Sequence, residues 1–232
     1  MRFLLFCLLL SLLVAILSLD PEYRYQQIIF FSDNVDAVRT AQALLPQGDS
    51  FLFFPYWGVK KALLHAEPSL ASVTFVPVFS NGFILEVLPQ ERDPIALLEN
   101  RNHVAYLDEN GVVFPFEKYF PNLFQIELPG KTPFFYGEKL ESPYDSQILK
   151  LLSVLNNFPQ MKFSYLRVDS KGDWRFFTKE GVCVKIGHLN DLQGKLSLLP
   201  VLFRVISTKK LQVASIDVRM KDMPVIAVKK QK

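Results

Sequence analysis

The sequence predicts an α+β protein with a single N-terminal transmembrane helix, a small β-α-α-β-β module and then a mostly antiparallel β-domain with flanking helices. Three observations predict this fold class. The chain opens on a long uncharged apolar run, a strand, two helices and two strands follow in that order, and most later runs are short β-type segments separated by turn residues. The predicted divisions are a cytoplasmic tail at residues 1–2, the transmembrane helix at 3–19, a first domain at 20–90 and a β-domain at 91–232.

The apolar run at residues 3–19 has the sequence FLLFCLLLSLLVAILSL and carries no charge. At about 1.5 Å of rise per residue, a helix of this length spans roughly 25 Å, which is inside the usual range for crossing a bilayer. Asp20 and Pro21 end the helix. The competing hypothesis is a cleaved signal peptide, but residues 16–20 lack the paired small side chains of a peptidase site. A retained, positively charged amino end predicts that the rest of the chain lies outside the cytoplasm.

Composition and charge restrict the classes of protein. The chain has 232 residues, of which 50% are hydrophobic, and its 21 Phe and 8 Tyr continue far beyond the apolar run, so the remainder can bury real cores. The formal net charge is +3 with both signs interspersed, unlike the dense basic stripe of a nucleic-acid-binding protein. The two cysteines, Cys7 and Cys183, lie far apart in the chain, which predicts an exported part without a disulfide.

The first domain begins with a β-type run at residues 23–31, YRYQQIIFF. Ser32 or Asp33 can cap a helix whose apolar face extends from Val35 to Leu45. The Asn81-Gly82 pair favours a tight hairpin turn between two strands. The remaining elements are a second helix at about 56–66 and strands at 71–79 and 83–88.

The β-domain is predicted to contain two meanders separated by a helix. Ser142-Pro143-Tyr144-Asp145 is a typical helix start, with a hydroxyl cap, a proline at the first position and a carboxylate near the positive end of the helix dipole. Pro200 should kink or shorten the last helix. The first meander comprises strands at 95–98, 104–107, 112–116 and 124–128, and the second comprises strands at 162–168, 173–178 and 181–186. The last helix covers 192–206, and two β-type runs, 211–220 and 223–228, close the chain.

The element order of residues 20–90 resembles the POTRA module, a three-stranded sheet that carries two helices on one face. Three local motifs are more specific: Glu91-Arg92-Asp93-Pro94-Ile95-Ala96, the turn Asp108-Glu109-Asn110-Gly111, and Ile216-Asp217-Val218-Arg219. Together they are similar to motifs of the FtsQ/DivIB family of bacterial cell-division proteins. The resemblance implies that the first motif joins a POTRA domain to a second, β-rich domain. Its interdomain signature residues are Glu91, Arg92, Pro94 and Ala96.

The resemblance also implies that the last strands form the edge of the second domain and receive a segment of FtsB by strand addition. Where the family commonly has an aromatic residue after the signature arginine, this chain has Met220. Alternation along the last strand predicts that about half of its side chains face the core, while each residue offers its backbone. The predicted partner-binding residues are Arg219, Met220, Val225, Ile226, Ala227 and Val228.

The function implied by the resemblance is that of a non-catalytic, single-pass scaffold in the inner membrane at the division septum. It would bind FtsB and FtsL outside the cytoplasm and, through FtsW and FtsI, help control septal peptidoglycan synthesis. One alternative is an anchored envelope enzyme acting on cell-wall glycan or peptide, with Glu91 and Asp93 as conceivable acid and base. A third hypothesis, a POTRA-type chaperone for β-barrel precursors, is disfavoured by a single module without a barrel.

The other residues that could carry chemistry favour structural roles. His65, His103 and His188 have no second histidine or cysteine at metal-ligand spacing, and Cys183 lies between two valines as a small core residue would. Arg92 could contact a partner, but an ion pair with a neighbouring carboxylate that sets the interdomain angle is the favoured interpretation. The basic tail could touch acidic lipids but is more typical of a solvated terminus. We therefore expect no cofactor, metal, nucleic acid or small-molecule substrate.

Overall fold

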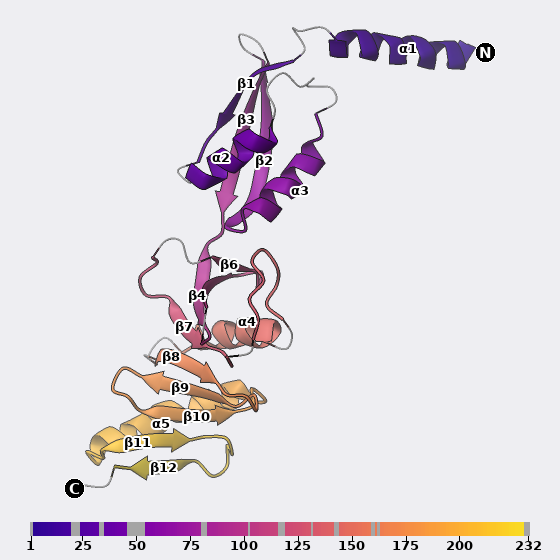
Figure 1. The fold of residues 1–232 in the computed structure, drawn as a ribbon. Coiled ribbons are helices and arrows are strands. Elements are labelled where there is room, and N and C mark those ends of the chain that lie inside the picture. Colours follow the sequence, from indigo (N-terminus) through magenta and orange to yellow (C-terminus); the bar gives the residue numbers. More distant parts are fainter. Residues whose placement is uncertain are drawn as a thin grey trace. The chain divides into compact units, whose positions relative to one another are not determined.

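The structure is a computed structural model in which the chain forms two compact units, Met1–Arg92 and Asp93–Lys232. Figure 1 shows the elements of both units. The structure describes residues 2–19, 24–32, 35–45, 54–79, 83–101, 103–115, 119–130, 132–141, 144–158, 161 and 163–229.

The chain begins with helix α1, Arg2–Leu19, and the structure describes the side chains of its residues 7–17. Among the described residues, no helix combines the length and the hydropathy needed to cross a membrane.

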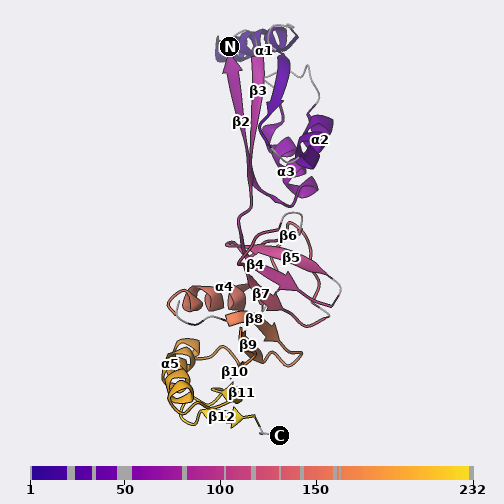
Figure 2. The same ribbon diagram turned by 90° about the vertical axis from the view of Figure 1, so that its left-hand side faces the viewer.

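The rest of the first unit is a three-stranded sheet with two helices. Its elements are β1 (Tyr25–Phe30), α2 (Val35–Leu44), α3 (Tyr56–Ala66), β2 (Leu70–Phe79) and β3 (Phe83–Glu91). The strand order is β1-β3-β2, with β1 parallel and β2 antiparallel to β3. Both helices lie on the same side of the sheet (Figure 2), where Ala41, Leu63 and Leu85 are fully buried. The predicted cap at Asp33 and hairpin turn at 80–82 lie outside the described residues.

The second unit is built on one nine-stranded mixed sheet in the order β12-β11-β10-β9-β8-β7-β4-β5-β6. Helices α4 and α5 lie on one side of this sheet (Figure 2). The bounds are β4 Pro94–Glu99, β5 Val104–Asp108, β6 Val113–Pro115, β7 Phe124–Glu127, α4 Tyr144–Leu155, β8 Phe163–Val168, β9 Trp174–Thr178, β10 Cys183–Gly187, α5 Leu192–Thr208, β11 Val213–Asp217 and β12 Val225–Val228.

Strand direction follows from the connections. The pairs β7–β8 and β10–β11 are parallel because a helix, α4 or α5, crosses over between the two strands of each pair. The predicted second meander is confirmed, since β8, β9 and β10 pair successively and antiparallel. The last helix extends through Pro200 to Thr208, two residues beyond the predicted end. The predicted start of α4 at Ser142 and Pro143 lies outside the described residues.

The first predicted meander is wrong in its last step. Strand β7 pairs in parallel with β4 and not with β6, which precedes it in the chain. The outer edge of β6 is already occupied, because the Val113 amide donates to the Glu138 carbonyl (2.9 Å) and the Gly137 amide donates to the Val113 carbonyl (2.8 Å). Strand β7 therefore pairs with the free edge of β4. The predicted hairpin between β6 and β7 is replaced by a crossover connection that places β7 parallel to β4.

The core of the second unit depends on side chains from the middle of the sheet. Leu166 of β8 is fully buried, whereas Val201 of α5 is 60% exposed. We expect Leu166→Ala to lower the free energy of unfolding by about 2–5 kcal/mol, because the cavity adds to the lost burial. The measurement is urea unfolding of the full chain in a Trp57→Phe background, so that the emission followed is that of Trp174, which is buried in the same core. Val201→Ala is the matched control, with an expected change within about 0.5 kcal/mol, and equal effects of the two substitutions would contradict this core assignment.

Candidate partner-binding edge

Strand β12 is the terminal strand of the nine-stranded sheet and is largely exposed. It pairs antiparallel with β11, with Ile216 opposite Ile226 and Asp217 opposite Val225. The side chain of Ile226 packs against the core, whereas Val225 and Val228 are 59% and 50% exposed. Ala227 is exposed as well, so one of the four side chains turns inward.

The backbone amides and carbonyls of β12 alternate between the side of β11 and the outer side of the sheet. The Lys229 amide donates to the Gln212 carbonyl (2.7 Å), on the side of β11. Because successive residues of a strand alternate the direction of their amides, those of Ala227 and Val225 also face β11. The amides and carbonyls of Ile226 and Val228 therefore face outward, where no strand pairs with them among the described residues.

The opposite end of the sheet is closed. Beyond the two bonds between Val113 and the 137–138 segment, the Leu140 amide donates to the Gly111 carbonyl (2.9 Å), and Val112 forms a β-bridge with Lys139. A loop thus pairs with the edge strand at that end. Within the described part of the second unit, β12 is the sheet edge that lacks such a cover.

The signature Asp217-Val218-Arg219 forms the turn that leads from β11 toward β12. The Arg219 guanidinium donates to both carboxylate oxygens of Asp217 (2.7–3.1 Å), and the Arg219 amide also donates to Oδ1 (3.1 Å). These hydrogen bonds hold the pKa of the Asp217 carboxyl below its ordinary value. The Arg219 side chain is nevertheless 54% exposed, so it remains accessible to a partner.

Gly187, at the end of β10, makes room for Arg219. Its φ of +68° favours glycine, and a Cβ there would lie 2.9 Å from Cγ of Arg219. A side chain at position 187 would therefore displace the arginine. The sequence alone did not indicate this contact, because it joins residues more than thirty positions apart.

Lys195 also shapes this region and was missed by the sequence analysis. Its buried ammonium donates to the carbonyls of Ile186 (2.9 Å) and His188 (2.7 Å), so it ties the first turn of α5 to the end of β10. Burial lowers the pKa of this lysine. The available signal was its spacing, because Leu192, Leu196 and Leu199 place Lys195 on the apolar face of the helix.

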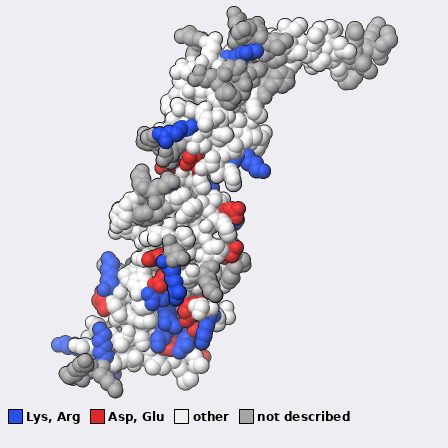
Figure 3. Space-filling view, in the orientation of Figure 1, with Lys and Arg blue, Asp and Glu red and all other residues white. Residues whose placement is uncertain are grey.

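The turn before β12 presents two methionines. Met220 and Met223 are 67% and 68% exposed, and Lys221 pairs with Asp191 (3.1 Å). Figure 3 shows further Lys and Arg side chains over β8, β9 and β10. In register across these strands lie Arg167, Arg175 and Lys185, with Glu127 and Asp217 on the flanking strands β7 and β11.

The four interdomain signature residues lie at strand ends and in the core. The Arg92 amide donates to the Ser69 carbonyl (2.8 Å) and its Nε donates to the Pro68 carbonyl (2.9 Å). Arg92 thereby holds the turn that precedes β2, within the first unit. The other three are Glu91 at the end of β3, Pro94 at the start of β4 opposite Asp108, and the fully buried Ala96 opposite Leu107.

The Asp108 turn has the geometry that its motif requires. One carboxylate oxygen of Asp108 accepts hydrogen bonds from the amides of Asn110 (2.9 Å) and Val112 (2.8 Å), and Gly111 has a φ of +79°. The turn thus connects β5 to β6 through its own side-chain bonds.

The Asp217–Arg219 pair makes a prediction about acid titration. Because the folded-state pKa of Asp217 is lowered, its carboxylate contributes stability that is fully present above the unfolded value of about 3.9 and is lost as the pH falls through the folded pKa. We expect Arg219→Gln to raise the pKa of Asp217 toward about 3.9, measured from the carboxyl 13C shift. Lys221→Gln is the control, because Lys221 pairs with Asp191. An unchanged Asp217 titration in Arg219→Gln would contradict the assigned cause.

The model of the C-terminal domain of cell division protein FtsQ/DivIB matches residues 96–219, which is more than half of the chain. The match begins at the buried Ala96 and ends at Arg219 of the signature turn, so β12 lies beyond it. No curated protein matches the chain. The chain therefore belongs to the FtsQ/DivIB family of cell division proteins.

Proposed function

We propose that this cell division protein is a non-catalytic scaffold that binds FtsB by adding a strand to the outer edge of β12. The observation that carries the proposal is the contrast between the two ends of the sheet: the β6 edge is covered by residues 137–140, whereas β12 presents outward-facing backbone groups. An open edge of this kind is a template for an extended peptide. FtsL would join the same complex, and FtsW and FtsI would be affected indirectly.

The surroundings of β12 supply side-chain contacts for such a strand. Val225 and Val228 are exposed apolar side chains on the strand, and Met220 and Met223 are exposed in the turn before it. Methionine is flexible and fits irregular apolar surfaces, so it can replace the aromatic residue common in the family. The exposed Arg219 guanidinium can contact an acidic group of the partner while Asp217 holds its position.

We further propose that residues 3–19 anchor the chain as a single-pass helix in the inner membrane and that the first unit is a POTRA domain. The support is the uncharged run at residues 3–19 and the β1-α2-α3-β2-β3 order, in which two helices lie on one side of the sheet. The second unit would then lie outside the cytoplasm at the division septum. This arrangement brings the β12 edge to partners that regulate septal peptidoglycan synthesis.

The first test removes one outward-facing amide. Val228→Pro deletes a donor on the partner side and places a ring there, while the amides that bond β11 remain. We expect FtsB binding by the full chain to weaken by about tenfold, since a net hydrogen bond is worth up to about 1.5 kcal/mol. Isothermal calorimetry with the FtsB of the same genome measures this. Val228→Thr keeps the amide and serves as control, and wild-type affinity in Val228→Pro would contradict strand addition.

The second test addresses the turn before β12. Met220 is 67% exposed, so Met220→Glu should change the free energy of unfolding by no more than about 0.5 kcal/mol. A carboxylate there cannot enter an apolar contact without losing hydration, and we expect FtsB affinity to fall. Met220→Leu, which keeps an apolar side chain, should bind as the wild type does. If Met220→Glu also binds as the wild type does, Met220 is not part of the interface.

A further inference from the structure

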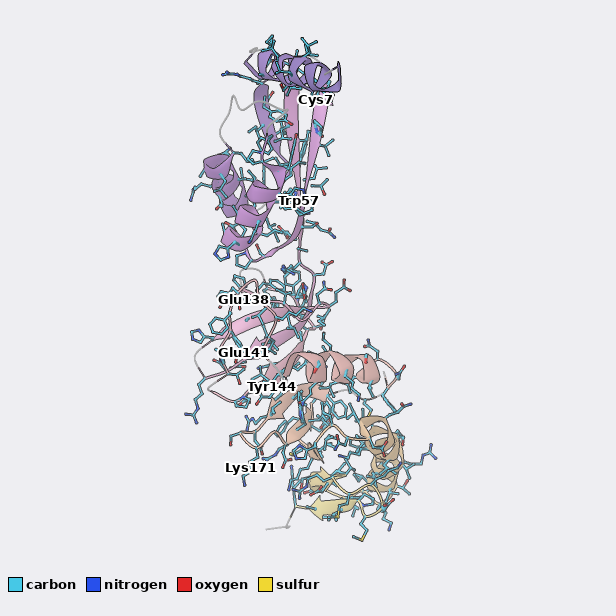
Figure 4. The ribbon with its side chains drawn as sticks, turned by 90° about the vertical axis from the view of Figure 1, so that its right-hand side faces the viewer. Cys7, Trp57, Glu138, Glu141, Tyr144 and Lys171 are labelled. Carbon is cyan, nitrogen blue, oxygen red and sulfur yellow. The ribbon has the colours of Figure 1, made fainter. Side chains whose placement is uncertain are left out.

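Trp57, in the first turn of α3, is 85% exposed, whereas Trp174 is 1% exposed. Figure 4 labels Trp57 on the first unit. Its neighbour Tyr56 turns inward, and the centroid of the Tyr56 ring lies 4.7 Å from that of Phe54 and 5.7 Å from that of Phe75. The fold thus uses one of two adjacent aromatic residues in its core and leaves the larger one in contact with solvent. An exposed tryptophan offers an apolar ring and an N–H donor to a surface outside this unit.

The position of Trp57 is tied to the point where the chain leaves α1. The hydroxyl groups of Tyr56 and Tyr25 are hydrogen-bonded to each other, and Tyr25 is the first residue of β1. Five residues, 20–24, separate Tyr25 from the end of α1 at Leu19. The six steps from Leu19 to Tyr25 span at most about 22 Å when fully extended. The start of β1, to which the first turn of α3 is bonded through Tyr56, is therefore tethered within this distance of the end of α1.

A second exposed aromatic residue, Phe79, lies at the end of β2 and is 58% exposed. Phe79 and Tyr25 are both opposite Phe83 of β3, on its two sides. The rings of Phe79 and Phe83 contact edge to face with centroids 5.0 Å apart. Lys61, four residues after Trp57 and also exposed, places a positive charge on the same side of α3.

We propose that Trp57 and Phe79 contact the headgroup region of the bilayer that holds α1, with Lys61 beside the lipid phosphates. The inference rests on the membrane anchor of the proposed function. Tryptophan favours the membrane interface because its ring is apolar and its N–H remains hydrogen-bonded there, and lysine extends its charge toward water and phosphate. The tether keeps these side chains at a high effective concentration near the lipid, so weak contacts are sufficient. The first unit would then hold a defined face against the membrane.

The two tryptophans make the test specific. The full chain is reconstituted into phosphatidylcholine vesicles carrying bromine either near the headgroup or near the end of the acyl chain, and flotation reports whether the chain is anchored. In Trp174→Phe, we expect a blue shift of Trp57 emission and greater quenching by the headgroup-proximal bromine. In Trp57→Phe, the buried Trp174 should show no quenching by either lipid. The difference spectrum between the wild type and Trp57→Phe gives the same Trp57 signal without altering the second unit.

The outcomes separate the two proposals. A chain that floats with the vesicles and shows quenched Trp57 emission supports both. A chain that floats while Trp57 emission stays unquenched and unshifted overturns the interfacial contact and leaves the anchor standing. A chain that does not float overturns the anchor and, with it, the contact inferred here.

Discussion

The second unit depends on how an open sheet satisfies the backbone groups of its two edge strands. An unpaired amide or carbonyl that loses water without gaining a partner costs free energy, so each edge must be covered, kept in water or paired with another chain. At the β6 edge, three backbone hydrogen bonds involving residues 137–140 provide the cover. At the β12 edge, no strand among the described residues pairs with the outward-facing groups. The same constraint that closes one end of the sheet makes the other end suitable for a partner.

The position of β12 is set by polar contacts in the turn that leads to it. Asp217 fixes Arg219 through both the backbone and the guanidinium, Gly187 leaves space for the arginine stem, and Lys195 joins the end of β10 to α5. Each bond is modest by itself, because most of these groups lie near solvent. Together they orient a strand that has a single side chain, Ile226, in the core. A strand so weakly buried needs this polar frame to stay at a fixed register.

Much of the element list could be predicted from the sequence, because apolar periodicity and turn residues are local signals. Residues 56–66 follow the period of a helix, and the predicted bounds of α3 are confirmed. Which strands pair with each other was harder to predict, because the apolar pattern of a strand does not specify its neighbour in the sheet. The β7–β4 pairing depends on the loop that covers β6, and this loop has no β-type pattern of its own. The contact of Gly187 with Arg219 was invisible for the same reason, whereas the apolar spacing around Lys195 was a signal that could have been used.

The family match ends at Arg219, so β12 lies outside it. In the proposed strand addition, the partner would hydrogen-bond mainly to the backbone of Ile226 and Val228, which depends little on their side chains. Specificity would then come from side chains that the fold holds in one position. Arg219, held by Asp217 inside the matched region, is such a group. We therefore infer that the turn selects the partner, while the strand supplies binding that depends little on side-chain identity.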